Sequence, residues 1–356
     1  MKKISIYGAG ENASYEEIGA IELIKGGGCA KIEVLLPEGS GELELHSARL
    51  VLSSFGVDAR LYTPGDFEKC EALISFGRPE VFSAIKKFSD KPQKMIYGIP
   101  ELLPTKTEIA AHSEGLIDEV FVKNRSRGVE TIKELVKKAK RGVEFRAGYV
   151  PFCNPSSDYF KLQFGKRKSS DCFHVMQNTP DGGDFCFPDH WLTVAKITCP
   201  HPRTKLFTAL NWGKNLTKTA GTPGDVRSPW HNLIDTILEA PSRASCALEK
   251  ETLDKSSALL HFYPKEEAFS FAAAKAILSG TVVIGGPAPA FVELIRHGET
   301  GFFAKTGDEA AYYTSRLAWE PFVQLKVATE AYAWFVNEGP GNADVCLPWW
   351  KGVLHV

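Results

Sequence analysis

Short apolar runs rich in β-branched residues alternate with longer segments of helical periodicity along the first half of the chain. Residues 15–25 and 45–55 carry apolar side chains at helical spacing, and residues 131–141 form a basic amphipathic pattern that ends before Gly142. This alternation predicts a parallel sheet flanked by helices. The predicted strands are residues 3–7, 31–36, 58–62, 72–76, 95–97 and 119–122.

A stretch rich in Pro, Asn and Ser, around residues 145–160, interrupts this pattern and indicates a domain junction. A second alternating series follows it, whereas residues 216–230 have weak periodicity and predict a long surface loop. We therefore predict an α/β protein with an N-terminal domain at 1–155, a C-terminal domain at 156–335 and a tail at 336–356. The later elements are strands at 173–176, 204–210, 258–262 and 281–284 and a mostly helical segment at 309–337.

Composition and charge narrow the class of protein. The 356 residues are 44% hydrophobic, which is enough for two domains with separate cores and excludes a disordered or fibrous chain. The formal charge of -1 gives no overall basicity, so binding to nucleic acid would require a local patch. No apolar run is long enough to cross a bilayer and the first residues do not resemble a signal peptide, so we expect no transmembrane segment and a cytoplasmic protein.

The eight cysteines are unclustered, which favours reduced thiols used as small core residues. One set of Cys and His residues lies close together in the sequence, but its C-x-H pairs do not have the spacing of structural zinc sites. We therefore expect no metal site. The set is Cys172, His174, Cys186, His190, Cys199 and His201.

A glycine-rich loop follows the first predicted strand. Residues 8–13 fit G-x-G-x-x-A, in which Gly8 and Gly10 let backbone amides approach a phosphate, and Asn12 and Ser14 add polar side chains to the loop. Taken alone, the motif indicates an NAD(P)-dependent oxidoreductase, with Glu38 at the ribose. The same motif also occurs wherever a strand turns sharply into a helix, so both interpretations stay open.

A longer pattern spans residues 261–308. Residues 264–271 are followed by a helix, then a small-residue strand at 279–284, then Gly285-Gly286 and Glu293, then the turn 297–302 and Gly307-Asp308. This order and spacing resemble the donor-binding segment of retaining nucleotide-sugar glycosyltransferases of the GT-B architecture. Weaker resemblance extends over residues 96–122, 149–160 and 206–213.

The resemblance implies two facing Rossmann-like domains, with the C-terminal helix crossing back to the first domain. It implies transfer of a sugar from a nucleotide-sugar donor, with retention of configuration and without a metal or other cofactor, because helix N-terminal amides and basic side chains stabilise the leaving diphosphate. The C-terminal domain would bind the donor and the N-terminal domain the acceptor.

The family motif also assigns individual residues. Glu267 matches the first Glu of the family's paired-Glu motif and would lie beside the donor sugar. The segment that follows would bind the donor through its backbone amides; its residues are Ala268, Phe269, Ser270 and Phe271.

Three departures from the family pattern affect the predicted site. Lys275 stands where the family has a second Glu, which accepts hydrogen bonds from the ribose. The basic pair that clamps the pyrophosphate is missing from residues 177–184, so Lys214 or Lys275 would supply the positive charge. The family's His near the transferred sugar is also missing, which leaves Glu101 as the nearest polar candidate.

The acceptor stays undefined by the sequence: a glycan, a small molecule or DNA. Two basic stretches, 133–141 and 166–168, would hold an anionic acceptor or are solvated surface. The alternatives to a glycosyltransferase are the oxidoreductase that uses residues 8–13 and a non-catalytic GT-B-like binding protein.

Overall fold

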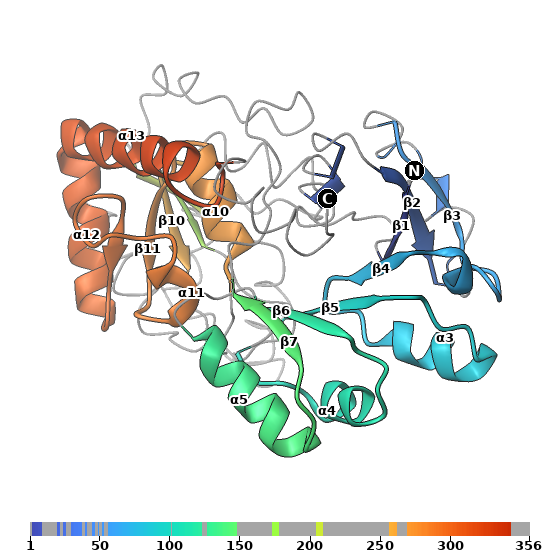
Figure 1. Ribbon diagram of the computed structural model, residues 1–356. Helices are drawn as coiled ribbons and strands as arrows, with labels where there is room; N and C mark the ends of the chain where they lie inside the picture. Colours follow the sequence, from blue (N-terminus) through green and yellow to red (C-terminus); the bar gives the residue numbers. More distant parts are fainter. Residues whose placement is uncertain are drawn as a thin grey trace, which may run out of the picture. The chain divides into compact units, whose positions relative to one another are not determined.

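The computed structural model divides the chain into two compact units (Figure 1). Unit 1 consists of Met1–Phe160 with Glu267–Phe269 and Val336–Val356, and unit 2 consists of Lys161–Glu266 and Ser270–Phe335. The predicted boundary near residue 155 lies outside the described residues, and the crossing of the tail to the first domain stays a prediction. The structure describes residues 2–8, 20–21, 24–25, 30–37, 40, 45–46, 49, 52, 56–100, 102–122, 127–147, 173–177, 204–208, 256–261 and 269–342.

Unit 1 contains a seven-stranded parallel sheet in the order β3-β2-β1-β4-β5-β6-β7. The six predicted strands are confirmed. The seventh was not predicted, because its sequence EFRA is short and half charged, and the segment interpreted as a junction therefore begins with a strand. The bounds are β1 Lys2–Tyr7, β2 Ala30–Leu36, β3 Asp58–Leu61, β4 Ala72–Ser75, β5 Met95–Ile99, β6 Glu119–Val122 and β7 Glu144–Ala147.

Each face of this sheet carries its own core. Ile4 and Ile6 point to one face with Val34, while Tyr7 and Leu35 point to the other, because side chains alternate along a strand. Helices α3 (Glu80–Phe88), α4 (Lys106–Ser113) and α5 (Gly128–Ala139) follow β4, β5 and β6. The sequence pattern predicted only α5. The short α4 lacks a clear apolar stripe, but its Thr105-x-x-Glu108 capping box was a usable signal.

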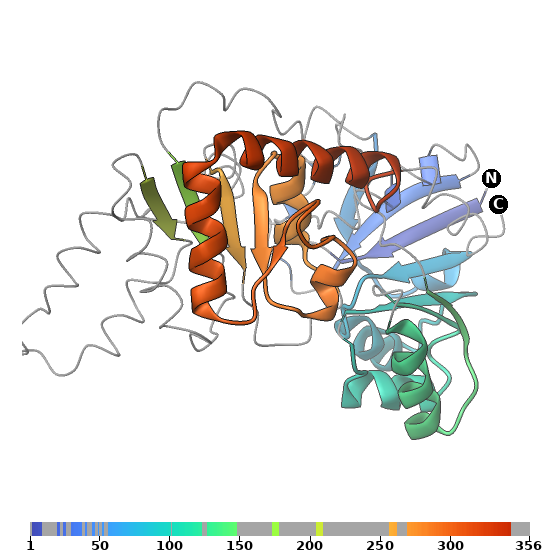
Figure 2. The ribbon, with the colours of Figure 1, turned by 90° about the vertical axis from the view of Figure 1, so that its left-hand side faces the viewer.

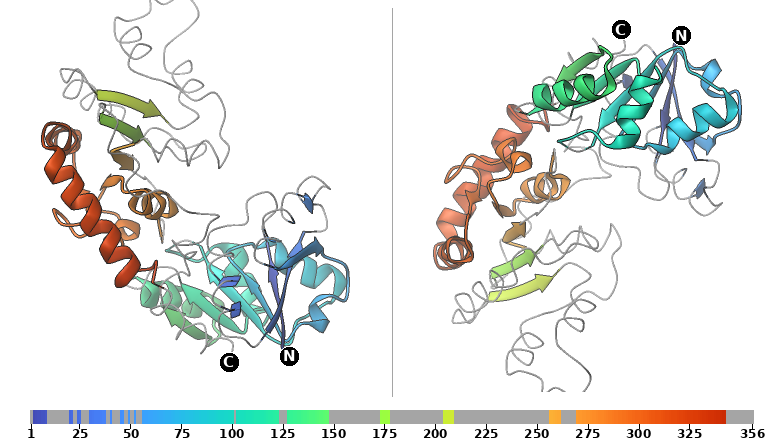
Figure 3. Two further views of the ribbon diagram at one scale, coloured as in Figure 1. Left: turned by 90° about the horizontal axis from the view of Figure 1, so that it is seen from above. Right: turned by 90° about the horizontal axis from the view of Figure 1, so that it is seen from below.

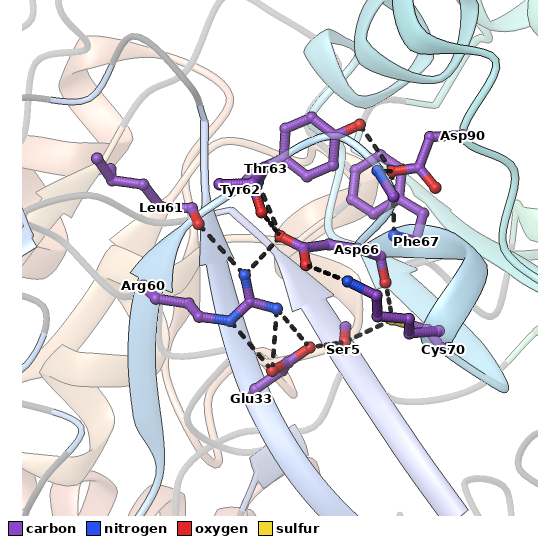
Figure 4. Close-up of polar contacts among 12 residues, drawn as sticks. Ser5, Glu33, Arg60, Leu61, Tyr62, Thr63, Asp66, Phe67, Cys70 and Asp90 are labelled. Atoms are coloured by element: carbon purple, nitrogen blue, oxygen red, sulfur yellow. Dashed lines mark hydrogen bonds and ion pairs between the residues drawn. The ribbon is translucent and has the colours of Figure 1, made fainter.

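The connection from β3 to β4 contains only a short 3-10 helix, η1 (Phe67–Lys69), and a buried polar network holds it on the sheet (Figure 4). Arg60 on β3 donates to Asp66 in the connection at 2.5 Å and to Glu33 on β2 at 3.3 Å. Ser5 on β1 donates to the same Glu33 at 2.8 Å. Arg60 thus attaches this connection to a network of side-chain hydrogen bonds that joins three strands.

These contacts shift the pKa values of the two carboxyl groups. Burial alone would raise the pKa of Asp66, but hydrogen bonds from Arg60 and Thr63 outweigh burial and lower it to about 2. Burial likewise opposes ionisation of Glu33, yet hydrogen bonds from Lys3 and Ser5 lower its pKa. Both groups are therefore held as carboxylates in the folded protein.

Asp90 anchors the same connection from the other side. Its carboxylate accepts hydrogen bonds from the Tyr62 hydroxyl and from the backbone N–H groups of Gly65, Phe67 and Glu68, at 2.8 to 3.1 Å. Asp90 is only 1% exposed. One buried carboxylate thus satisfies three backbone N–H groups of the connection and one tyrosine hydroxyl.

Unit 2 contains a five-stranded parallel sheet in the order β12-β11-β10-β8-β9. Four of its strands agree with the predicted ones within two residues at each end. The predicted helical segment is two helices, which meet at Glu320 because Pro321 disfavours helical conformation in the residue before it. The bounds are β8 Phe173–Gln177, β9 Thr204–Thr208, β10 Ala258–His261, β11 Val282–Gly285, β12 Phe302–Phe303, α10 Phe271–Leu278, α11 Pro289–Val292, α12 Gly307–Trp319 and α13 Pro321–Asn337.

Helices cover both faces of this sheet. Helices α12 and α13 pack on one face, where Ala311 and Val327 contact Leu260 and Ile284 (Figure 2). Helix α10 lies on the opposite face (Figure 3). Among the described residues, no helix combines the length and apolar character that crossing a membrane requires.

Candidate functional site

The clearest candidate site lies at the carboxyl edge of the unit 2 sheet. Strands β10 and β11 are parallel neighbours, with His261 paired to Gly285, so both strands end at the same edge. Helix α10 connects them and starts at this edge. The next neighbour, β8, ends here too, because Leu260 pairs with Gln177. The chain leaves β8 and β10 in opposite directions, and such a switch point is where α/β sheets bind ligands.

Ser270 defines the start of α10. Its side chain accepts a hydrogen bond from the Ala273 N–H at 3.3 Å, and it is only 1% exposed. Alanines in the helix are buried, which lets it pack closely on the sheet. The first turn of α10 therefore opens at the carboxyl edge, where the sequence predicted a donor-binding segment.

Two of the predicted donor-binding side chains have clear positions. The Phe269 side chain is 5% exposed and belongs to the core, so only its backbone is suited to binding a ligand. Lys275 lies in the second turn of α10 and is half-buried. It lies about 7.5 Å along the helix axis from the Ser270 cap, at 1.5 Å per residue.

Gly285 is the last residue of β11, and there is little space for a side chain beside it. A Cβ atom there would lie 3.1 Å from the ring of Phe291 in α11. The same ring packs edge-on against the His261 imidazole, with centroids 5.1 Å apart. His261 was not singled out from the sequence, where a histidine at the end of an apolar strand gives no distinctive signal. It is 1% exposed.

The turn at residues 296–301 has the geometry that its sequence predicted. Gly298 has φ +82°, a left-handed conformation that favours glycine, and the Thr300 hydroxyl accepts from the Arg296 N–H at 2.8 Å. A Cβ atom on Gly301 would lie 2.8 Å from the Val283 carbonyl oxygen. The left-handed conformation explains Gly298, and the close approach of the two backbones explains Gly301, where β12 lies beside β11.

A second candidate site is the carboxyl edge of the unit 1 sheet. The switch point here lies between β1 and β4, because β2 and β3 extend to one side and β5 to β7 to the other. Tyr7 pairs with Ser75, and Gly8 follows directly, its N–H donating to the Leu35 carbonyl at 3.2 Å. The predicted glycine loop therefore starts at the switch point, although only Gly8 of its named residues is described.

The opposite, amino edge of unit 1 carries a shallow depression of about 670 Å³. Charged residues line it, including Lys94, Asp118, Arg141 and Glu144. The sequence analysis proposed nothing at this edge.

Several predicted site residues lie outside the described residues, so their roles stay predictions. No group of three or more His, Cys, Asp or Glu side chains suited to a metal ion occurs in the part of the chain that the structure describes. Of the Cys and His set, only the backbone of His174, in β8, is described. The undescribed site residues are Glu267, Ala268, Lys214, Glu101, Gly10, Asn12 and Ser14.

Comparison with known proteins identifies the fold. No known family model matches the chain, and no curated protein is similar enough in sequence to match it. Solved structures do match. The structure of HepE from Anabaena in complex with UDP and glucose has a TM-score of 0.69 at 14% identity, covering 100% of both chains.

Two further structures show how widely this fold is used. Sucrose-phosphate synthase from Thermosynechococcus elongatus has a TM-score of 0.62 at 11% identity, covering 100% of this chain and 98% of its own. UDP-GlcNAc 2-epimerase from Neisseria meningitidis, bound to UDP-GlcNAc, has a TM-score of 0.57 at 10% identity, covering 100% of both chains. The fold is the GT-B fold of two Rossmann-like domains, and the predicted fold class is confirmed.

Proposed function

We propose that the protein is a glycosyltransferase that moves a sugar from a nucleotide-activated donor to an acceptor, without a metal and with retention of configuration. The observation that carries the proposal is the placement of the motif residues. Ser270 caps α10 and Gly285 ends β11 at one carboxyl edge of the sheet, and the Gly301 turn leads into β12 beside β11. The same edge of α/β sheets binds nucleotides in general. The fold shared with UDP-bound structures supports a nucleotide-sugar donor.

The proposed chemistry needs positive charge beside the leaving diphosphate. Backbone amides at the start of α10, in residues 268–271, would donate to its oxygens, where the helix dipole favours negative charge. Lys275 or Lys214 would add a cation. Glu267 would accept hydrogen bonds from the donor sugar, so its removal should affect turnover more than nucleotide binding.

Unit 1 would bind the acceptor at its own carboxyl edge. Gly8 begins the loop there, with Gly10, Asn12 and Ser14 as its further residues, and Glu101 follows β5. We propose a glycan or a small molecule as the acceptor. DNA has weaker support, because the charges of α5 include internal Glu–Lys pairs.

Titration with nucleotides tests the donor assignment. Calorimetry with UDP, ADP, GDP and their glucose conjugates should give heat for at least one pair. At 100 times the dissociation constant, that ligand should stabilise the native state by about 2.7 kcal/mol. Heat with NAD(P)H and none with any nucleotide sugar would instead establish the oxidoreductase. Absence of heat with both NAD(P)H and the nucleotide sugars would favour the non-catalytic binding protein.

Glu267→Gln tests the motif itself. The variant should bind the nucleotide as the wild type does but release nucleoside diphosphate at least tenfold more slowly. Glu299→Gln is the matched control, because Glu299 is an exposed glutamate in the turn that precedes β12. Equal turnover of all three proteins would remove Glu267 from the site.

The fold also supports one other activity, because UDP-GlcNAc 2-epimerases share it. Incubation with UDP-GlcNAc in the absence of any acceptor separates the two functions. Inversion at C2, followed by NMR, would identify an epimerase. Release of UDP that depends on an added acceptor would identify a transferase.

A further inference from the structure

Charged side chains at the two edges of the unit 1 sheet are partnered differently. At the amino edge, Lys94 pairs with the buried Glu119 at 2.6 Å, and the Arg141 guanidinium donates to the His112 carbonyl at 3.3 Å. At the carboxyl edge, the Arg78 guanidinium has no hydrogen-bond or ion-pair partner among the described residues. It is alone in this among the five arginines of unit 1 whose side chains are described, which are Arg49, Arg60, Arg78, Arg127 and Arg141.

Arg78 also lies at the switch point of the sheet. Strands β1 and β4 are neighbours in the sheet (Figure 1). Strand β4 ends at Ser75, which pairs with Tyr7 at the end of β1, and Arg78 is three residues further on. Ligands of open α/β sheets bind at such a crevice, beyond the carboxyl ends of the strands. An exposed cation there is placed to meet a bound molecule.

The turn that carries Arg78 is held firmly. The Ser75 hydroxyl accepts from the Arg78 N–H and donates to the Arg78 carbonyl, both at 3.3 Å. Gly77 has φ +76°, and a Cβ atom there would lie 2.8 Å from the ring of Pro100. Phe76 is buried and packs against Phe121, with ring centroids 5.4 Å apart. The backbone is therefore positioned in advance, whereas the guanidinium has no partner in the part of the chain that the structure describes.

Charges of both signs accompany Arg78 at this edge. Lys106, at the start of α4, is exposed and has no partner among the described residues. The nearby Glu108 is buried and occupied by Tyr97 and the Thr105 N–H, at 3.1 and 2.7 Å. Glu80, in the first turn of α3, forms no ion pair with Arg78 within the described structure. A guanidinium presents paired N–H donors that match a phosphate or a carboxylate.

We propose that Arg78 binds a phosphate group of the acceptor, so that the substrate glycosylated by this protein is a phosphorylated molecule. The assignment of this phosphate to the acceptor rests on the proposed function. The phosphate could belong to a sugar phosphate or to a lipid phosphate, which present the same oxygens to the guanidinium.

The experiment compares phosphorylated molecules with their neutral counterparts. The pairs are glucose 6-phosphate with glucose, glycerol 3-phosphate with glycerol, and dihexanoyl phosphatidic acid with dihexanoylglycerol. Calorimetry on the wild-type protein, with UDP present, should show tighter binding of the phosphorylated member of at least one pair, and the pair that responds identifies the source. Arg78→Ala should weaken that binding at least tenfold, and Arg78→Lys should restore part of it, because a lysine keeps the charge but not the paired donors.

Lys31→Ala is the matched control, because Lys31 is an exposed cation near the amino end of β2 in the same unit. If Lys31→Ala and Arg78→Ala weaken binding of the phosphorylated molecule equally, the effect is one of net charge, and the proposal is overturned. A wild-type protein that binds no phosphorylated member better than its neutral partner would also overturn it. UDP affinity should be unchanged in Arg78→Ala, so failure of the donor assignment remains separate from failure of this one.

Discussion

Replacing Asp90 by Ala should destabilise unit 1 more than any surface change. The substitution removes a buried carboxylate and leaves four donors without their acceptor: the Tyr62 hydroxyl and three backbone N–H groups. These donors belong to the connection between β3 and β4, which has no long helix of its own. The connection therefore has few internal hydrogen bonds to replace those that Asp90 accepts.

The expected size follows from how exposed each donor is. Tyr62 and Phe67 are buried, at 2% and 0% exposure, so their unsatisfied donors cost about 1 to 3 kcal/mol each. Gly65 and Glu68 are close enough to solvent for water to replace the carboxylate. We therefore expect a loss of about 2 to 6 kcal/mol in the free energy of unfolding. A loss of that size is a large fraction of the stability of an ordinary domain.

The assay must report on unit 1 directly. Five of the seven tryptophans lie in unit 2 and only Trp349 and Trp350 in unit 1, so tryptophan fluorescence does not report on unit 1 selectively. Hydrogen exchange measured on peptides covering residues 62–70 does. Exchange of the Phe67 amide should accelerate strongly in Asp90→Ala and remain unchanged in Asp58→Ala, an exposed aspartate at the start of β3. Unchanged exchange in both variants, with a loss below about 1 kcal/mol, would refute the reasoning.

Three further outcomes can be measured. The pKa of Asp66 is lowered in the folded protein, so its stabilising contribution is present at neutral pH and is lost as the pH falls from about 4 to about 2. The free energy of unfolding in urea should therefore depend less on pH across that range for Asp66→Asn than for the wild type. Gly98→Ala would place a Cβ atom 2.3 Å from the Phe121 ring, so the free energy of unfolding measured by circular dichroism should fall by about 1 to 3 kcal/mol. Gly142→Ala is the control: it has open space around it and should lower the free energy of unfolding by less than about 0.5 kcal/mol. Ser270→Ala removes the cap of α10 and should cost about 1 kcal/mol in unit 2, where tryptophan fluorescence does report.

Much of the fold was predictable from local pattern. Buried strands of a parallel sheet are short apolar runs, and most of the strands in the described residues were located from those runs alone. The motif at residues 261–308 also predicted which segments come together, because a strand, a helix and a parallel strand can connect in essentially one way. The glycines at 298 and 301 were similarly informative, since each satisfies a local backbone requirement.

Other features depended on the tertiary structure. Glu33 and Arg60 are 27 residues apart, and only the register of β2 beside β3 brings their charges together. Asp90 meets the connection at residues 62–68 across a similar separation, with no sequence pattern that links the two. That Arg78 has no partner among the described residues was equally invisible in the sequence, because the partners of a side chain depend on all its surroundings. Sequence periodicity reports which residues are buried, whereas the choice of polar partners depends on how separately formed elements pack.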